Sequence, residues 1–118
     1  MNVQLWDPNK TVKTVAVGTP VYSDALKVIN TDGYFSLQYY FTAVVAGGTA
    51  AFDVESSNDG VNFVACNTQI STGQAASTWA LKEVIMVPCK YARIKVTAST
   101  QNITNLNAWF YGVERVSA

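Results

Sequence analysis

Residues 50–66 read AAFDVESSNDGVNFVAC, and this stretch decides the fold class. Its apolar residues alternate with polar ones, which is the period-two pattern of a half-buried β-strand. Residues 57–60 interrupt the alternation with Ser, Asn, Asp and Gly, the residue types that occupy tight hairpin turns. The stretch therefore predicts a β-hairpin in which Phe52 and Val54 point inward before the turn, and Val61, Phe63 and Ala65 resume the alternation after it.

Similar alternation outside the hairpin predicts strands at residues 34–43, 80–87, 91–98 and 105–113, with shorter ones at 12–17 and 25–29. No stretch of ten residues has apolar side chains at helical spacing. About seven or eight short strands separated by turns predict an all-β fold, an antiparallel two-sheet β-sandwich that is jelly-roll-like and has an extended N-terminal segment. A closed barrel is the alternative architecture.

Three further segments of the sequence lead to separate predictions. Both faces of residues 80–87 are apolar, so we expect a central strand that is covered on both sides. The Gly47-Gly48 pair lies between two predicted strands and predicts a hairpin connection. Residues 67–79 are rich in Ser, Thr and Gln and predict a long polar loop.

The chain length suits one domain with a sizeable core. We expect the 118 residues to form a single β-sandwich domain, in which residues 1–20 are an N-terminal arm or an edge strand. The first residues lack the basic and apolar regions of a signal peptide, and no apolar run approaches the roughly 20 residues that span a bilayer. We therefore expect no membrane contact, and either synthesis and retention in a reducing cytoplasm or an already processed form.

The charge balance narrows the classes of partner. Eight Lys and Arg residues match eight Asp and Glu residues, so the chain has no basic field to hold a nucleic-acid backbone. Charged residues make up 14% of the chain, against a usual value of about 25%. A surface with few charges and no net charge favours association with other proteins.

The residue types needed for catalysis are missing. The chain has no histidine, which removes the commonest general base and the commonest metal ligand. Its carboxylates are explained by turns and strand faces, and it has no phosphate-binding glycine loop. We therefore expect no enzyme activity, no catalytic residues, no cofactor and no metal. Cys66 and Cys89 are either two buried thiols or one disulfide.

The aromatic residues divide into core candidates and contact candidates. The phenylalanines are expected in the core: Phe35, Phe41, Phe52, Phe63 and Phe110. Tyrosine and tryptophan are enriched at binding hot spots, and those that fall in the N-terminal segment, in the polar loop or on outward strand faces are the interaction candidates: Trp6, Trp79, Tyr40, Trp109 and Tyr111. They would serve as assembly contacts or as a platform for sugar rings.

The hairpin and a later strand also carry a family resemblance. A strand that ends in Ser-Asn-Asp-Gly and is followed three residues later by an aromatic, as in residues 52–63, resembles small β-sandwich modules, and residues 91–97 resemble the strand that follows in such modules. Over residues 50–113 the chain resembles discoidin-like domains and, more closely, the small virion structural proteins of tailed bacteriophages, such as capsid decoration proteins and head or tail accessory proteins. The resemblance implies an oligomer that contacts neighbouring virion proteins and has no turnover.

These observations favour a structural protein of a virus particle, made in the host cytoplasm and located in the virion. Its expected partners are copies of itself, in a homo-oligomer, and other virion proteins. The alternative is a carbohydrate-binding or receptor-recognition β-sandwich module with a glycan as its ligand.

Overall fold

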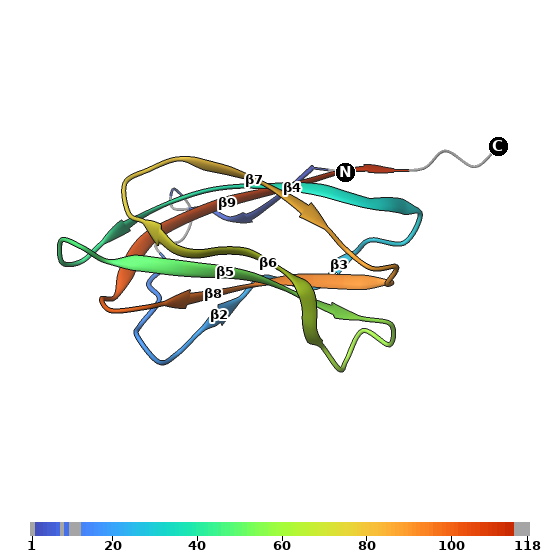
Figure 1. Cartoon of the computed structure of the whole chain (residues 1–118), viewed down its shortest axis with the longest axis horizontal. Helices are drawn as coiled ribbons and strands as arrows, with labels where there is room; N and C mark the ends of the chain where they lie inside the picture. The colour runs from blue at the N-terminus through green and yellow to red at the C-terminus, as the bar shows by residue number, and fades with distance from the viewer. Residues whose placement is uncertain (1, 8, 10–12, 115–118) are drawn as a thin grey trace.

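The computed structural model of the chain describes residues 2–7, 9 and 13–114 and shows two stacked antiparallel β-sheets (Figure 1). No helix occurs in this part of the chain, so it holds none that could cross a membrane. The predicted all-β sandwich is therefore confirmed. The strands are β1 (Asn2–Trp6), β2 (Val21–Tyr22), β3 (Leu26–Lys27), β4 (Thr31–Ala43), β5 (Thr49–Ser57), β6 (Val64–Ala75), β7 (Ala80–Ile85), β8 (Tyr91–Ala98) and β9 (Ile103–Glu114).

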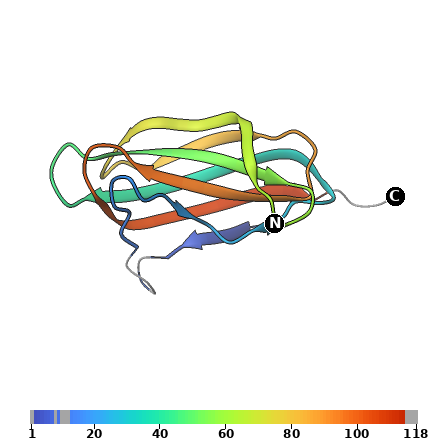
Figure 2. The same ribbon diagram turned by 90° about the horizontal axis from the view of Figure 1, so that it is seen from below.

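The strand order is that of a jelly roll. Sheet A has the order β1-β9-β4-β7, and sheet B has the order β2-β8-β5-β6, with β3 also paired to β8. The antiparallel pairs are nested around the turn between β5 and β6: β5 pairs with β6, β4 with β7, β2 and β3 with β8, and β1 with β9. Two sheets wound from one folded ribbon are the jelly-roll arrangement. Figure 2 shows β1 alongside β9, although these strands lie at opposite ends of the sequence.

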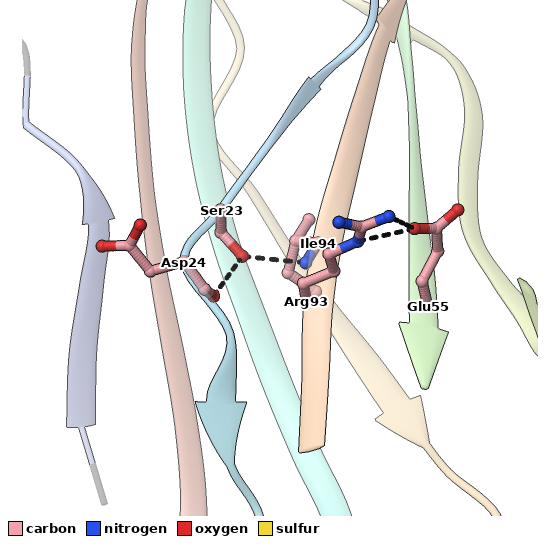
Figure 3. Close-up of polar contacts among 5 residues, drawn as sticks. All are labelled: Ser23, Asp24, Glu55, Arg93 and Ile94. Atoms are coloured by element: carbon pink, nitrogen blue, oxygen red, sulfur yellow. Dashed lines mark hydrogen bonds and ion pairs between the residues drawn. The ribbon is translucent and has the colours of Figure 1, made fainter. Parts of the chain in front are cut away.

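Strands β2 and β3 are one strand interrupted at Ser23. The Ser23 hydroxyl accepts a hydrogen bond of 2.9 Å from the Ile94 amide and donates one of 3.1 Å to the Asp24 carbonyl oxygen (Figure 3). The side chain thus satisfies a β8 amide that would otherwise lack a backbone partner at the break. Counting β2 and β3 together reduces nine strands to eight, in agreement with the predicted number.

The turn between β5 and β6 is held by a small hydrogen-bond network. Asp59 Oδ1 accepts from the amides of Val61 at 2.9 Å and Asn62 at 2.8 Å, and Asp59 Oδ2 accepts from Asn62 Nδ2 at 2.8 Å. The Ser57 hydroxyl donates to Asp59 Oδ1 and accepts from the Gly60 amide. Gly60 has a φ of 79°, a conformation that strongly favours glycine. The Ser-Asn-Asp-Gly turn predicted from the sequence is confirmed.

The core lies between the two sheets and is built on stacked aromatic rings. Phe35 and Phe110 have ring centroids 4.9 Å apart, and those of Tyr39 and Phe52 are 3.8 Å apart. All four side chains are buried. A Cβ at Gly112 would lie 2.2 Å from Phe35 Cδ1, so the Phe35 ring occupies the space that a larger residue in β9 would need. The inward faces predicted for residues 34–43, 91–98 and 105–113 are confirmed.

The predicted polar loop at residues 67–79 is wrong. Strand β6 runs to Ala75, and only residues 76–79 connect it to β7. The polar composition of these residues indicated a loop, but β6 is an outer strand of sheet B and has three register irregularities against β5. Such a strand does not show the regular alternation of a central one.

Three further expectations fail, and the first two depended on which strands are neighbours. Strand β7 is an edge strand with one exposed face, not a central one covered on both sides. The Gly47-Gly48 segment joins β4 of sheet A to β5 of sheet B and is not a hairpin connection. In the β5–β6 turn, Val61 is 79% exposed, and Phe63 lies half-buried against Arg93 instead of in the core.

The N-terminal segment supplies an edge strand. β1 pairs with β9, and Trp6 is buried in the core at 8% exposure. Of the strand predicted at residues 12–17, only the bridge between Val15 and Ile103 is present, and Val12 lies outside the described residues.

The burial of Trp6 generates a prediction for stability. We expect Trp6→Ala to lower the free energy of unfolding by about 3–5 kcal/mol, because it removes a large buried side chain and leaves a cavity. Urea denaturation followed by circular dichroism measures this change. Trp79→Ala is the control, since that indole is 55% exposed, and it should cost about 1 kcal/mol or less. Equal losses in the two variants would contradict the core position of Trp6.

The Asp59 network generates a prediction for pH. Hydrogen bonds to the Asp59 carboxylate hold its pKa well below the ordinary value, and those from the backbone amides of Asn62 and Val61 have the largest effect. A carboxylate whose pKa is lowered by folding stabilises the fold fully above its unfolded pKa, and this contribution is lost as pH falls through the folded pKa. We therefore expect Asp59→Asn to reduce stability at neutral pH and to flatten the acid side of the stability profile.

Urea unfolding between neutral pH and pH about 2 tests this prediction. Asp24→Asn is the control, because no hydrogen bond to the Asp24 carboxylate occurs in the described part of the chain. If Asp59→Asn and Asp24→Asn both show the same dependence of unfolding free energy on pH as the unmodified protein, the Asp59 carboxylate does not stabilise the turn.

Candidate functional site: the outer face of sheet A

The outward side chains of sheet A form a continuous surface that we call the aromatic face. They alternate along their strands with the buried core residues, and none of them is buried. The aromatic face consists of Asn2, Gln4, Tyr34, Ser36, Gln38, Tyr40, Leu81, Glu83, Ile85, Asn107, Trp109, Tyr111 and Val113, together with Trp79 immediately before β7.

Strand register arranges these residues in rows across the sheet. One row runs from Gln4 through Trp109 and Gln38 to Leu81. The next runs from Asn2 through Tyr111 and Ser36 to Glu83. Residues directly opposite in antiparallel strands point to the same face of the sheet, so each row brings together side chains from four strands.

At one end of the face, Trp79 covers Tyr40. Their ring centroids are 5.0 Å apart with an interplanar angle of 31°. Tyr40 also lies opposite Asn107 in the register of β4 and β9. Because Trp79 stays 55% exposed, the pair presents an indole to solvent while the tyrosine supports it.

The middle of the face is slightly hollowed. A depression of about 220 Å³ is lined by Asn2, Ser36, Gln38, Leu81, Trp109 and Tyr111. Its walls combine two aromatic rings and one aliphatic side chain with amides and a hydroxyl. On one side Gln4 Nε2 donates a 3.1 Å hydrogen bond to Asn107 Oδ1, which fixes these amides relative to each other.

The face carries a single charged side chain, Glu83. The Tyr34 hydroxyl donates a hydrogen bond to Glu83, and this bond and the nearby carboxylate charge raise the pKa of Tyr34 above its ordinary value. The Glu83 carboxylate therefore has a hydrogen-bond donor on the same surface. Leu81, 69% exposed, and Ile85, 53% exposed, extend the apolar part of the face to the β7 edge.

The outer face of sheet B has a different character, because charged residues of β5 and β8 lie opposite one another on it. Arg93 forms an ion pair of 2.7 Å with Glu55, shown in Figure 3, and Asp53 lies opposite Lys95. The Arg93 guanidinium also lies over the rings of Tyr22 and Phe63, at 4.2 and 4.5 Å from their centroids. Hydrogen-bonding and cation–π partners within the chain leave this face fewer groups for another molecule.

The structure brings together four of the five residues predicted as contacts. Tyr40, Trp79, Trp109 and Tyr111 all lie on the aromatic face. Trp6 does not, because the register of β1 turns its indole into the core. Gln38 and Leu81 were not among the predicted contacts, since their place beside Trp109 follows only from strand pairing.

The described residues hold no group of three or more Cys, Asp or Glu side chains that could bind a metal ion. The rings and aliphatic carbons of the aromatic face provide apolar contact, and its amides provide hydrogen bonds that fix the orientation of a bound molecule.

Comparisons with known proteins show a shared fold. No protein-family model matches the chain, and no curated protein matches its sequence. Structures of infectious bursal disease virus, strains Gt and Gx, are similar to 97% of the chain, with TM-scores of 0.52 and 0.58 and identities of 10% and 11%.

A third similar structure contains the CBM22-1–GH10 modules of a Clostridium thermocellum endo-1,4-β-D-xylanase 10B complexed with xylohexaose. It covers 99% of the chain with a TM-score of 0.50 and 14% identity. The chain spans 32% of each viral chain and 27% of the xylanase chain. At these identities the likeness is one of fold.

Proposed function

We propose that this chain is a structural protein of a virus particle, a capsid decoration protein or a head or tail accessory protein, that packs against other protein surfaces through its aromatic face. The observation that carries the proposal is a sheet face rich in exposed apolar and aromatic side chains with one charge. Contiguous exposed apolar surface is typical of protein contact sites. Jelly rolls are a common fold of viral capsid domains. The similarity of the fold to the two viral structures also supports a role in a virus particle.

The partner we commit to is a second copy of the chain. The face has the composition of an interface centre, with Trp and Tyr present and charged residues nearly absent. Two copies related by a twofold axis would bring identical patches together without opposing rows of like charge. The zero net charge of the chain also leaves little long-range repulsion between copies.

The free edge of sheet A at β7 is poorly suited to self-association. Strand β7 carries Lys82 and Glu83 in the middle of its exposed edge. Charged residues on an edge strand oppose edge-to-edge pairing. We therefore propose a contact made face to face that includes Leu81 and Trp79, and no turnover of any substrate.

A charge introduced into the face tests this proposal. We expect the unmodified protein to form dimers or larger oligomers in sedimentation equilibrium, and Leu81→Lys to weaken association at least about thirtyfold. The reason is that an unpaired charge buried in an interface costs roughly 2 kcal/mol or more.

The matched control is Val61→Lys, in the β5–β6 turn, where the side chain is 79% exposed and outside the aromatic face. It should associate like the unmodified protein. A protein that stays monomeric across the concentration range, or equal effects of the two lysines, would show that the face is not a self-association surface.

A second candidate function, glycan binding, is favoured by the depression between Trp109 and Tyr111. Its rings could stack on the C–H faces of a sugar, and Gln38, Asn2 and Ser36 could hydrogen-bond sugar hydroxyls. We expect a glycan array to show binding by the unmodified protein that Trp109→Ala abolishes and Trp109→Phe partly restores. An array with no bound glycan would exclude this candidate and leave the protein contact unaffected.

A further inference from the structure

One end of the sandwich carries no charged side chain, and we call it the uncharged end. It is formed by four connecting segments, residues 16–20, 44–48, 76–79 and 99–102, none of which contains Asp, Glu, Lys or Arg. Asn102 joins two of them, because its carbonyl oxygen accepts from the Val44 amide at 3.1 Å and its Oδ1 accepts from the Val17 amide at 3.0 Å. The Ser77 amide donates to the Phe41 carbonyl oxygen at 2.7 Å, which ties a third segment to the end of β4.

The charges of the loops gather at the opposite end of the molecule. The sandwich measures 51 Å along its long axis and 25 by 23 Å across it, so its two ends are well separated. The turns at the other end contain Asp32, Asp59 and Lys90. Because an uncharged surface costs less to remove from water than a charged one, the uncharged end is the one suited to burial in a contact.

The connection between β4 and β5 protrudes from the uncharged end. Figures 1 and 2 both show it as the outermost part of that end. Its two consecutive valines are exposed, Val44 at 62% and Val45 at 52%. Neighbouring exposed apolar side chains are typical of protein contact sites.

A hollow of about 310 Å³ lies beside the two valines. It is lined by small residues: Ala43, Ala46, Gly47, Gly48, Thr49, Ala75, Ala76 and Ser77. A Cβ at Gly48 would lie 2.6 Å from the Ala43 Cβ, so the packing at this position requires glycine. Walls without large side chains leave room for an apolar side chain of another molecule and let two backbones come close.

We propose that the uncharged end binds a second copy of the chain end to end, with the Val44 and Val45 side chains of each copy seated in the hollow of the other. The β4–β5 connection contains both the protruding valines and part of the hollow, and a twofold axis makes such a pair of features reciprocal. Two identical ends without charge also do not repel each other.

This end contact is separate from the proposed contact through the aromatic face. Two different twofold contacts on one chain allow assembly to continue beyond a dimer. We therefore expect the unmodified protein to form species larger than dimers in sedimentation equilibrium.

Single substitutions separate the two contacts. Leu81→Lys removes the contact through the aromatic face, so we expect this variant to remain a dimer held by the uncharged end. Adding Val45→Asp to it should weaken the remaining dimer at least about thirtyfold, because the carboxylate would be buried without a partner charge. The matched control adds Val61→Asp instead, at the opposite end where the side chain is 79% exposed, and should leave the dimer unchanged. Circular dichroism checks that each variant is folded.

A mixing experiment tests the reciprocal seating of the valines. In the Leu81→Lys background, Ala75→Arg places a long cationic side chain at the exposed wall of the hollow and should also weaken the dimer. We expect an equimolar mixture of the Val45→Asp and Ala75→Arg proteins to associate more tightly than either alone. In the mixed dimer the new carboxylate of one copy meets the new guanidinium of the other, and the second valine pair enters an unmodified hollow.

The end contact is wrong if the Leu81→Lys protein is monomeric at every concentration, if Val45→Asp leaves its dimer intact, or if the mixture associates no better than its components. A monomer that cosediments with phosphatidylcholine vesicles, and loses this binding through Val45→Asp, would assign the valines to a membrane instead. If Leu81→Lys changes nothing while Val45→Asp dissociates the protein, the end contact holds and the contact through the aromatic face does not.

Discussion

The turn between β5 and β6 is the constraint from which the rest of the jelly roll follows. Asp59 and Ser57 fix its geometry through short hydrogen bonds, and the strand pairs then nest outward from it to β1 and β9. Each outer pair brings together segments farther apart in the sequence than the pair inside it. Because loop-closure cost grows with the length of chain enclosed, an inner hairpin that is already closed makes the outer pairs easier to form.

The nested pairing also creates the aromatic face. Trp109 and Tyr111 come from β9, near the C-terminus, while Gln38 and Ser36 come from β4. They are neighbours only because β9 and β4 lie side by side in the middle of sheet A. Their inward neighbours Phe110 and Leu37 are buried, so the same alternation that fills the core fixes which side chains reach solvent.

The two outer faces of the sandwich have opposite chemistry. On sheet B, Arg93 is held by Glu55 and by two aromatic rings, so its charge is already satisfied within the chain. On sheet A, large apolar side chains such as Leu81 stay exposed and the polar groups are mostly neutral amides. This contrast is why we propose the outer face of sheet A, and not that of sheet B, as the surface that binds a partner.

What the sequence determined by itself is local: the turn at Asn58 and Asp59, the strands around it, and which side chains along β4, β8 and β9 point inward. Period-two alternation reports the faces of one strand, so Tyr40, Trp109 and Tyr111 could be placed outward without knowing their neighbours. Only the tertiary structure decided which strands pair. It turned Trp6 into the core, made β7 an edge and set Leu81 and Gln38 in the row of Trp109. Pairing joins residues distant along the chain, and no local pattern records the partner across the sheet.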